Sequence, residues 1–104
     1  MILTNGINNR SGNIKELMWG DDVADDGSLS LPASTTGFCL AGCGDEFAIF
    51  FWSSSGARVI LISSANVVTT DTDNNFCILD GGTTIVLKNR LGGPHGIMYM
   101  CLYE

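Results

Sequence analysis

The chain has 104 residues, of which 45% are hydrophobic and only 15% are charged, and its formal net charge is −6. Disorder is excluded because it requires low hydrophobicity, and the length fits one domain spanning residues 1–104. Binding to nucleic acid or to an anionic membrane surface is disfavoured, since both need clustered basic residues and the five here are scattered.

Short β-rich runs separated by Gly, Asn, Asp and Ser dominate the sequence, which is typical of strands joined by tight turns. In chain order the predicted strands are Asn13–Trp19, Ser28–Leu31, Gly37–Ala41, Glu46–Trp52, Arg58–Ser63, Phe76–Leu79, Thr83–Lys88 and Ile97–Tyr103, with a further short one near Asn66–Thr70. No stretch of helical length keeps an apolar stripe of period 3.6. Eight or nine such strands predict an all-β fold, an antiparallel β-sandwich of jelly-roll type.

Two pairs of neighbouring strands have the sequence of a hairpin. Phe76–Leu79 and Thr83–Lys88 flank Asp80-Gly81-Gly82, and Asp-Gly in a short loop suits the twist of antiparallel strands. A Ser-Gly loop joins Glu46–Trp52 to Arg58–Ser63 in the same way. We therefore expect both pairs to be antiparallel neighbours.

The runs Phe47–Trp52, Val59–Ile62 and Ile97–Tyr103 are apolar on both faces, unlike a strand with one face in water. In a sandwich this small, the opposite sheet covers one face and nothing within the chain is left to cover the other. Burying a large side chain is worth about 1.5–3 kcal/mol, so a second chain is the expected cover. The residues predicted to form this interface are Phe50, Trp52, Met98, Met100 and Leu102.

Four cysteines, Cys39, Cys43, Cys77 and Cys101, allow three disulfide pairings. The N-terminus lacks the pattern of a signal peptide, and no apolar run approaches the roughly 20 residues that span a bilayer. We therefore expect a cytoplasmic product whose thiols are reduced and packed as small apolar groups. The alternative, a zinc site, would combine the first three cysteines with Cys101 or His95 from distant segments, and structural zinc usually takes tighter spacings.

Two acidic loops contain candidate cation ligands. Residues 71–75 place three oxygen side chains at alternate positions, like the start of an EF-hand loop, but Phe76 stands where that motif needs its bend glycine. Residues 21–26 carry four carboxylates, which suit a hard cation or an acid–base pair. Solvated turns are the favoured explanation of both loops, so no metal or cofactor is predicted. The candidate ligands are Asp71, Asp73, Asn75, Asp21 and Asp25.

No enzyme motif is complete. Gly42-Cys43-Gly44 begins like a dinucleotide fingerprint, but Phe47 replaces the third glycine and a strand follows where a helix is needed. His95 is the single histidine, and no serine or cysteine near it has the context of a nucleophile. The sequence therefore predicts a protein that is not an enzyme.

The aromatic residues leave two interpretations open. Aromatic faces suit sugar rings, so they could form a glycan-binding platform, but aromatics also supply much of the area in cores and subunit contacts. The latter interpretation is favoured. The residues concerned are Trp19, Trp52, Tyr99 and Tyr103.

Three stretches carry a resemblance: Trp19–Ser28, Ile62–Val67 and Leu87–Gly92. They resemble small β-sandwich or jelly-roll proteins from the structural modules of tailed bacteriophages and prophages. The resemblance implies a virion- or tail-associated protein that forms homo-oligomers, contacts other virion proteins, and is present in the bacterial cytoplasm during assembly and in the virion afterwards. It marks no catalytic residue.

Together these observations predict a non-enzymatic structural protein that acts by homo-oligomeric assembly. The alternative is a ligand- or glycan-binding module of a phage host-attachment component.

Overall fold

The computed structural model describes residues 14–104, which form nine strands and no helix. The strands are β1 (Lys15–Val23), β2 (Ser28–Ser30), β3 (Gly37–Cys43), β4 (Glu46–Trp52), β5 (Arg58–Ser63), β6 (Val67–Val68), β7 (Asn75–Asp80), β8 (Ile85–Arg90) and β9 (His95–Tyr103). The predicted all-β class is therefore confirmed. Across these residues we find no helix with the length and apolar character that crossing a bilayer requires.

The predicted strand positions agree well with the structure. The bounds of β4 and β5 are as predicted, whereas β1 runs four residues past its predicted end, to Val23. Gly and Asp are poor strand formers, but Gly20, Asp21 and Asp22 all pair with β9, and this pairing overrides local propensity. The first residue of the predicted strand, Asn13, lies outside the described residues.

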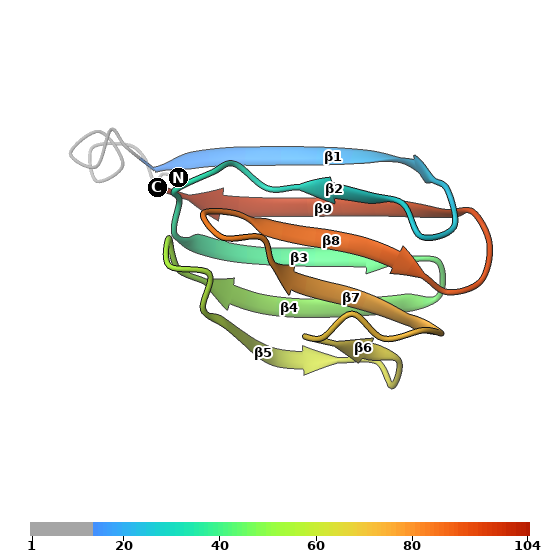
Figure 1. Cartoon of the computed structure of the whole chain (residues 1–104). Coiled ribbons are helices and arrows are strands. Elements are labelled where there is room, and N and C mark those ends of the chain that lie inside the picture. The colour runs from blue at the N-terminus through green and yellow to red at the C-terminus, as the bar shows by residue number, and fades with distance from the viewer. Residues whose placement is uncertain (1–13) are drawn as a thin grey trace.

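The strands form two sheets, with the orders β1-β9-β3-β4-β5 and β2-β8-β7-β6. In Figure 1, β8 and β7 are drawn across the front of β3 and β4, so the four-stranded sheet lies over the five-stranded one. All neighbouring strands are antiparallel except β6 and β7, which are parallel. Both predicted hairpins, β4–β5 and β7–β8, are confirmed.

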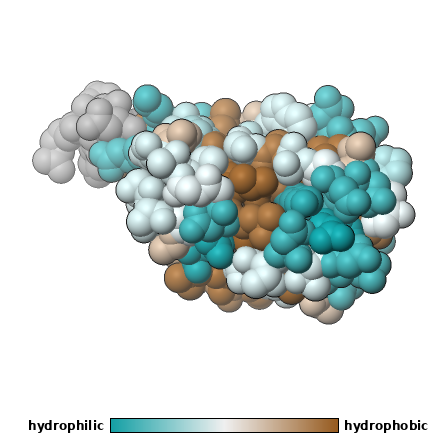
Figure 2. Space-filling view, in the orientation of Figure 1, coloured by the Kyte–Doolittle hydropathy of each residue, from teal (hydrophilic) through white to brown (hydrophobic). Residues whose placement is uncertain are grey.

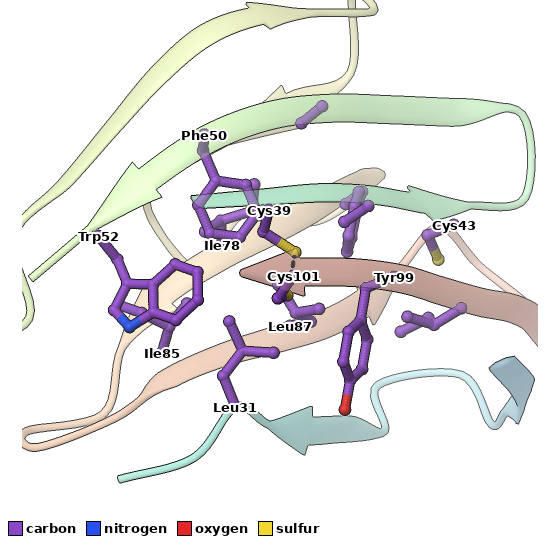
Figure 3. Packing of buried hydrophobic residues seen from close by; sticks show 14 of the residues in the cluster. Leu31, Cys39, Cys43, Phe50, Trp52, Ile78, Ile85, Leu87, Tyr99 and Cys101 are labelled. Carbon is purple, nitrogen blue, oxygen red and sulfur yellow. Dashed lines mark hydrogen bonds between the residues drawn. The ribbon is translucent and has the colours of Figure 1, made fainter. Parts of the chain in front are cut away.

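The hydrophobic core lies between the two sheets and draws side chains from both. Figure 3 shows Phe50 and Trp52 of β4 facing Ile78, Ile85 and Leu87 from the four-stranded sheet. The indole Nε1 of Trp52 donates a hydrogen bond to the Thr35 hydroxyl at 3.2 Å, so its polar atom is satisfied. Each sheet therefore buries one face, and its other face points away from the core.

The predicted interface positions of Phe50 and Trp52 are wrong, because both side chains point into the core and are 0% and 3% exposed. Both faces of β4 are apolar, so alternation alone does not choose between them. The choice is made by β3, where Gly37 lies opposite Trp52 and leaves room for the indole. A Cβ at Gly37 would lie 2.8 Å from the Trp52 ring. The other predicted interface residues, Met98, Met100 and Leu102, do face outward.

A two-residue turn, Gly44-Asp45, joins β3 to β4 and accounts for the glycines that resembled a nucleotide-binding loop. Gly44 has φ +59°, which suits the first central position of the mirror-image turns that hairpins favour. A Cβ at Gly44 would also approach the ring of His95 to 2.8 Å. The role of this segment is thus to form the hairpin.

Asn89 of β8 is the buried polar residue among residues 14–104. Its amide nitrogen donates to the carbonyl oxygens of Val23, Ala24 and Gly93 at 3.0, 3.3 and 2.8 Å. Its amide oxygen accepts from the Leu91 backbone nitrogen at 3.0 Å. One fully bonded side chain therefore connects the end of β1 to the loop before β9.

Candidate functional site: an apolar sheet face

The outward side of the five-stranded sheet is apolar across its whole width. Its middle row of directly paired residues runs from one edge to the other through Met18, Met100, Leu40, Ile49 and Ile62. Rows on either side of it add further apolar residues at alternate positions of the same strands. We call this surface the apolar face; it consists of Met18, Phe38, Leu40, Phe47, Ile49, Phe51, Val59, Ile62, Met98, Met100 and Leu102.

Nine of these side chains are exposed, by fractions between 37% for Leu40 and 70% for Met18. Since large apolar side chains have roughly 150–200 Å² each, the apolar face leaves on the order of 900 Å² uncovered. The largest apolar patch on a typical monomer is only about 300–600 Å². A stable interface buries about 800 Å² on each partner. The apolar face is therefore larger than an ordinary monomer surface and large enough for a stable interface.

The apolar face has no charge at its centre. The outward positions of β9, β3, β4 and β5 carry no charged side chain, and only the edge strand β1 adds carboxylates, at Glu16 and Asp22. Depletion of charge at the centre with polar groups at the rim is the anatomy of an interface. The net charge of −6 is thus carried elsewhere on the molecule.

The four-stranded sheet presents the opposite kind of surface. Figure 2 views the molecule from this side and shows hydrophilic and intermediate residues on either side of a central hydrophobic strip. Arg90 of β8 lies 3.1 Å from a carboxylate oxygen of Asp26 and 2.8 Å from one of Asp71, and Lys88 also contacts Asp71 at 2.9 Å. The two sheets therefore differ sharply: one outer face is charged and the other is apolar.

A hollow of about 690 Å³ lies within the apolar face. Its floor includes Gly20 and Gly42, which have no side chains to fill the outward positions they occupy. Met98 separates these two glycines in the paired row, and Phe47 follows Gly42 in the same row. The absence of side chains at Gly20 and Gly42 therefore leaves a depression in the apolar face.

Of the candidate cation ligands, Asp71 is already paired with basic side chains. Hydrogen bonds from Lys88 and then Arg90 lower the pKa of the Asp71 carboxyl, so the anion is stabilised without a metal. Asp73 lies 3.7 Å from Arg90, and the Asn75 amide donates to the backbone carbonyl of Asp73 at 2.8 Å. Among residues 14–104, no three His, Cys, Asp or Glu side chains form a group that could hold a metal.

The other two candidates, Asp21 and Asp25, are exposed. An oxygen of the Asp21 carboxylate accepts the backbone N–H of Asp22 at 2.8 Å. The residue of this acidic stretch that does reach Asp71 is Asp26, through the Arg90 that both contact. Sequence spacing did not indicate this link, because it depends on the pairing of β2 with β8.

All four cysteines are buried thiols. Cys39 and Cys101 lie directly opposite each other on β3 and β9, and Cys101 donates a hydrogen bond to Cys39 with 2.7 Å between the sulfurs (Figure 3). This contact together with burial raises the pKa of Cys39 far above its ordinary value. Burial raises the pKa of Cys43 to about 11 and also raises that of Cys77. Such thiols are poor nucleophiles at neutral pH.

The aromatic residues do not form one platform. Trp52 and Tyr99 are buried, and Tyr103 is half-buried. Trp19 is 40% exposed and stacks on Tyr99 with ring centroids 6.0 Å apart. His95 is half-buried at the start of β9, where it pairs with Val23 of β1, and among residues 14–104 its side chain makes no hydrogen bond or ion pair.

Several residues of the apolar face were missed from the sequence. Phe47, Ile49 and Phe51 were not among the predicted interface residues, because both sides of β4 are apolar and the sequence does not show which side faces outward. Met18 and Leu40 were missed because their strands look ordinary when read alone. In β5, the run Val59–Ile62 was recognised as not alternating, but none of its residues was predicted at the interface, although the strand lies at the sheet edge. The register shifts between Ile49 and Phe50 because β5 has an extra, unpaired residue there, Leu61.

Comparisons with protein-family models, with curated proteins and with solved structures find no match for this chain.

Proposed function

We propose that the chain is a non-enzymatic assembly module that self-associates through the apolar face. The observation that carries this proposal is the continuous row of apolar side chains across all five strands, unbroken by charge. Two acidic chains repel each other wherever their carboxylates approach, so pairing is favoured where neither copy has any. The apolar face is the surface that meets this condition. Two copies packed face to face would form a dimer in which both faces are covered.

The experiment inserts a charge at the centre of the apolar face. Leu40→Lys places two unpaired ammonium groups in the proposed interface, so we expect the dissociation constant of the dimer to rise by about a hundredfold or more. Ser30→Lys adds the same side chain on the outward side of the four-stranded sheet and should leave association unchanged. Light scattering of both variants at equal concentration measures the difference. Equal masses for the wild type, Leu40→Lys and Ser30→Lys would contradict the proposal.

The wider biological setting is a virion- or tail-associated protein of a phage or prophage, and its support is the resemblance of the motifs in Trp19–Ser28, Ile62–Val67 and Leu87–Gly92. We also propose a jelly-roll-like sandwich as the finer fold. In its favour, the first strand pairs with the last, β1 with β9, and the second pairs with the second to last, β2 with β8, as in a jelly roll. The middle strands β3, β4 and β5 instead pair with one another in chain order within one sheet. Location of the gene among capsid or tail genes would support the setting, and location among unrelated genes would count against it.

Ligand binding is the second candidate function, and the hollow in the apolar face favours it. A volume of about 690 Å³ falls in the range of small-molecule sites, but the apolar lining suits an apolar ligand better than a sugar. Anilinonaphthalene sulfonate distinguishes the two functions. If assembly covers the face, the wild type should bind this dye weakly at micromolar concentration and Leu40→Lys should bind it strongly. Strong binding by a monomeric wild type would favour the ligand-binding role.

A further inference from the structure

The hollow in the apolar face is shaped by the absence of two side chains. Gly42 and Gly20 both occupy outward positions of the five-stranded sheet. A Cβ added at Gly42 would meet its nearest neighbours at 3.5 and 3.7 Å, and neither glycine has a positive φ that forbids a side chain. The backbone would therefore accept larger residues at both positions, and the open space is a property of the surface that glycine creates.

The hollow is too open to hold a small ligand by itself. The side chains of Met18, Phe47 and Met98 around it are themselves 52–70% exposed. Small-molecule sites bury about 70–90% of their ligand, which requires walls that close over it. A second protein surface lying across the apolar face supplies this cover. An apolar side chain carried by a second copy is therefore a better occupant than a free molecule.

Phe51 is the side chain of the apolar face that best fits the hollow. It is 47% exposed and does not line the hollow, in contrast to Phe47, the other exposed aromatic of the face. Its ring is supported by Phe38, with centroids 5.5 Å apart, so little ordering is needed before it binds. It lies four residues along β4 from Phe47, the partner of Gly42, which places the ring about 13 Å from the hollow.

We propose that in the dimer the Phe51 ring of each copy inserts into the hollow over Gly42 of the other. This inference rests on the proposed function, because it requires the two apolar faces to pack together. A two-fold axis lying between the sheets and midway between Phe51 and the hollow exchanges the two features, so both contacts are equivalent. Sheets pack about 10 Å apart, which leaves space for an aromatic ring where the facing residue is glycine.

The test combines two substitutions that act on the same contact. Gly42→Leu fills the hollow from its own chain, and Phe51→Ala removes the inserted ring. Each should raise the dimer dissociation constant about 30-fold, as expected for a residue that dominates an interface. In one chain the two should partly compensate, because the leucine occupies the space that the ring has left, so the double variant should dimerise more tightly than Gly42→Leu alone. Sedimentation equilibrium measures all four dissociation constants.

A control pair and a folding check complete the test. Leu102→Ala also shortens a side chain of the apolar face, on β9 two strands away from Phe51, and its effect should simply multiply with that of Gly42→Leu. Far-UV circular dichroism verifies the fold of each variant, and Gly42→Ala is the milder substitution if Gly42→Leu does not fold. The inference is overturned if the wild type is a dimer and Gly42→Leu associates equally well, or if its effect multiplies with that of Phe51→Ala. A monomeric wild type overturns the proposed function instead.

Discussion

Phe50 and Phe51 are adjacent on β4 and point to opposite sides of the sheet, so they provide a matched pair of variants. Phe50 is 0% exposed and packs in the core, whereas Phe51 is 47% exposed on the apolar face. Truncation of a fully buried phenylalanine costs about 3–5 kcal/mol. Complete burial of a large side chain is worth about 1.5–3 kcal/mol, so Phe51, with half of that burial in one copy, should contribute about 1 kcal/mol.

Urea unfolding of Phe50→Ala and Phe51→Ala tests this difference. Both substitutions are made in the Leu40→Lys variant, so that association adds nothing to the free energy of unfolding. We expect the unfolding midpoint of Phe50→Ala to lie more than about 1 M below that of Phe51→Ala, because small domains lose about 1–3 kcal/mol per molar urea. Failure of Phe50→Ala alone to fold leads to the same conclusion. Equal midpoints, or a lower one for Phe51→Ala, would refute the assignment of the two faces of β4.

Three further predictions concern the rest of the fold. Asn89→Leu should cost about 2–3 kcal/mol in urea unfolding, since three partly buried carbonyl oxygens and one N–H lose their partner; a loss below 1 kcal/mol would contradict this role. Gly37→Ala should lower stability by about 1–3 kcal/mol because its Cβ would crowd the Trp52 ring, whereas Gly93→Ala has open space and should change it by less than about 0.5 kcal/mol. Hydrogen bonds from the Ser64 hydroxyl and the Asn66 backbone lower the pKa of the Glu46 carboxyl from its ordinary value of 4.5. The Glu46 carboxylate therefore stabilises the fold above pH 4.5, and this stabilisation is lost as the pH falls through the folded-state pKa. Glu46→Gln should therefore lose less stability than the wild type below pH 4.5, and identical pH profiles would contradict this.

Much of the fold follows from local signals. Gly, Asn, Asp and Ser mark nearly every turn, so the positions of β4 and β5 and the two hairpins were predictable. The extension of β1 through Gly20–Val23 was not, because Gly20, Asp21 and Asp22 are poor strand formers and are held by pairing with β9. The parallel pairing of β6 with β7 also depends on distant segments meeting.

The existence of an uncovered apolar surface was predictable from strands that are apolar on both sides, but its exact membership was not. Met98, Met100 and Leu102 were placed correctly because the alternate positions of β9 include Cys101 and Tyr99, which enter the core. Phe50 and Trp52 were placed on the wrong side because β4 offers two apolar faces of similar size. The choice depends on the small residues opposite them, Cys39 and Gly37, and that pairing is a property of the folded sheet.

Sedimentation velocity of the wild-type chain over a range of micromolar concentrations tests self-association most directly. We expect a species of twice the chain mass of 11.1 kDa that dissociates on dilution. A species that keeps the single-chain mass up to the highest concentration would contradict it. In that case the apolar face would need a different partner from a second copy of this chain.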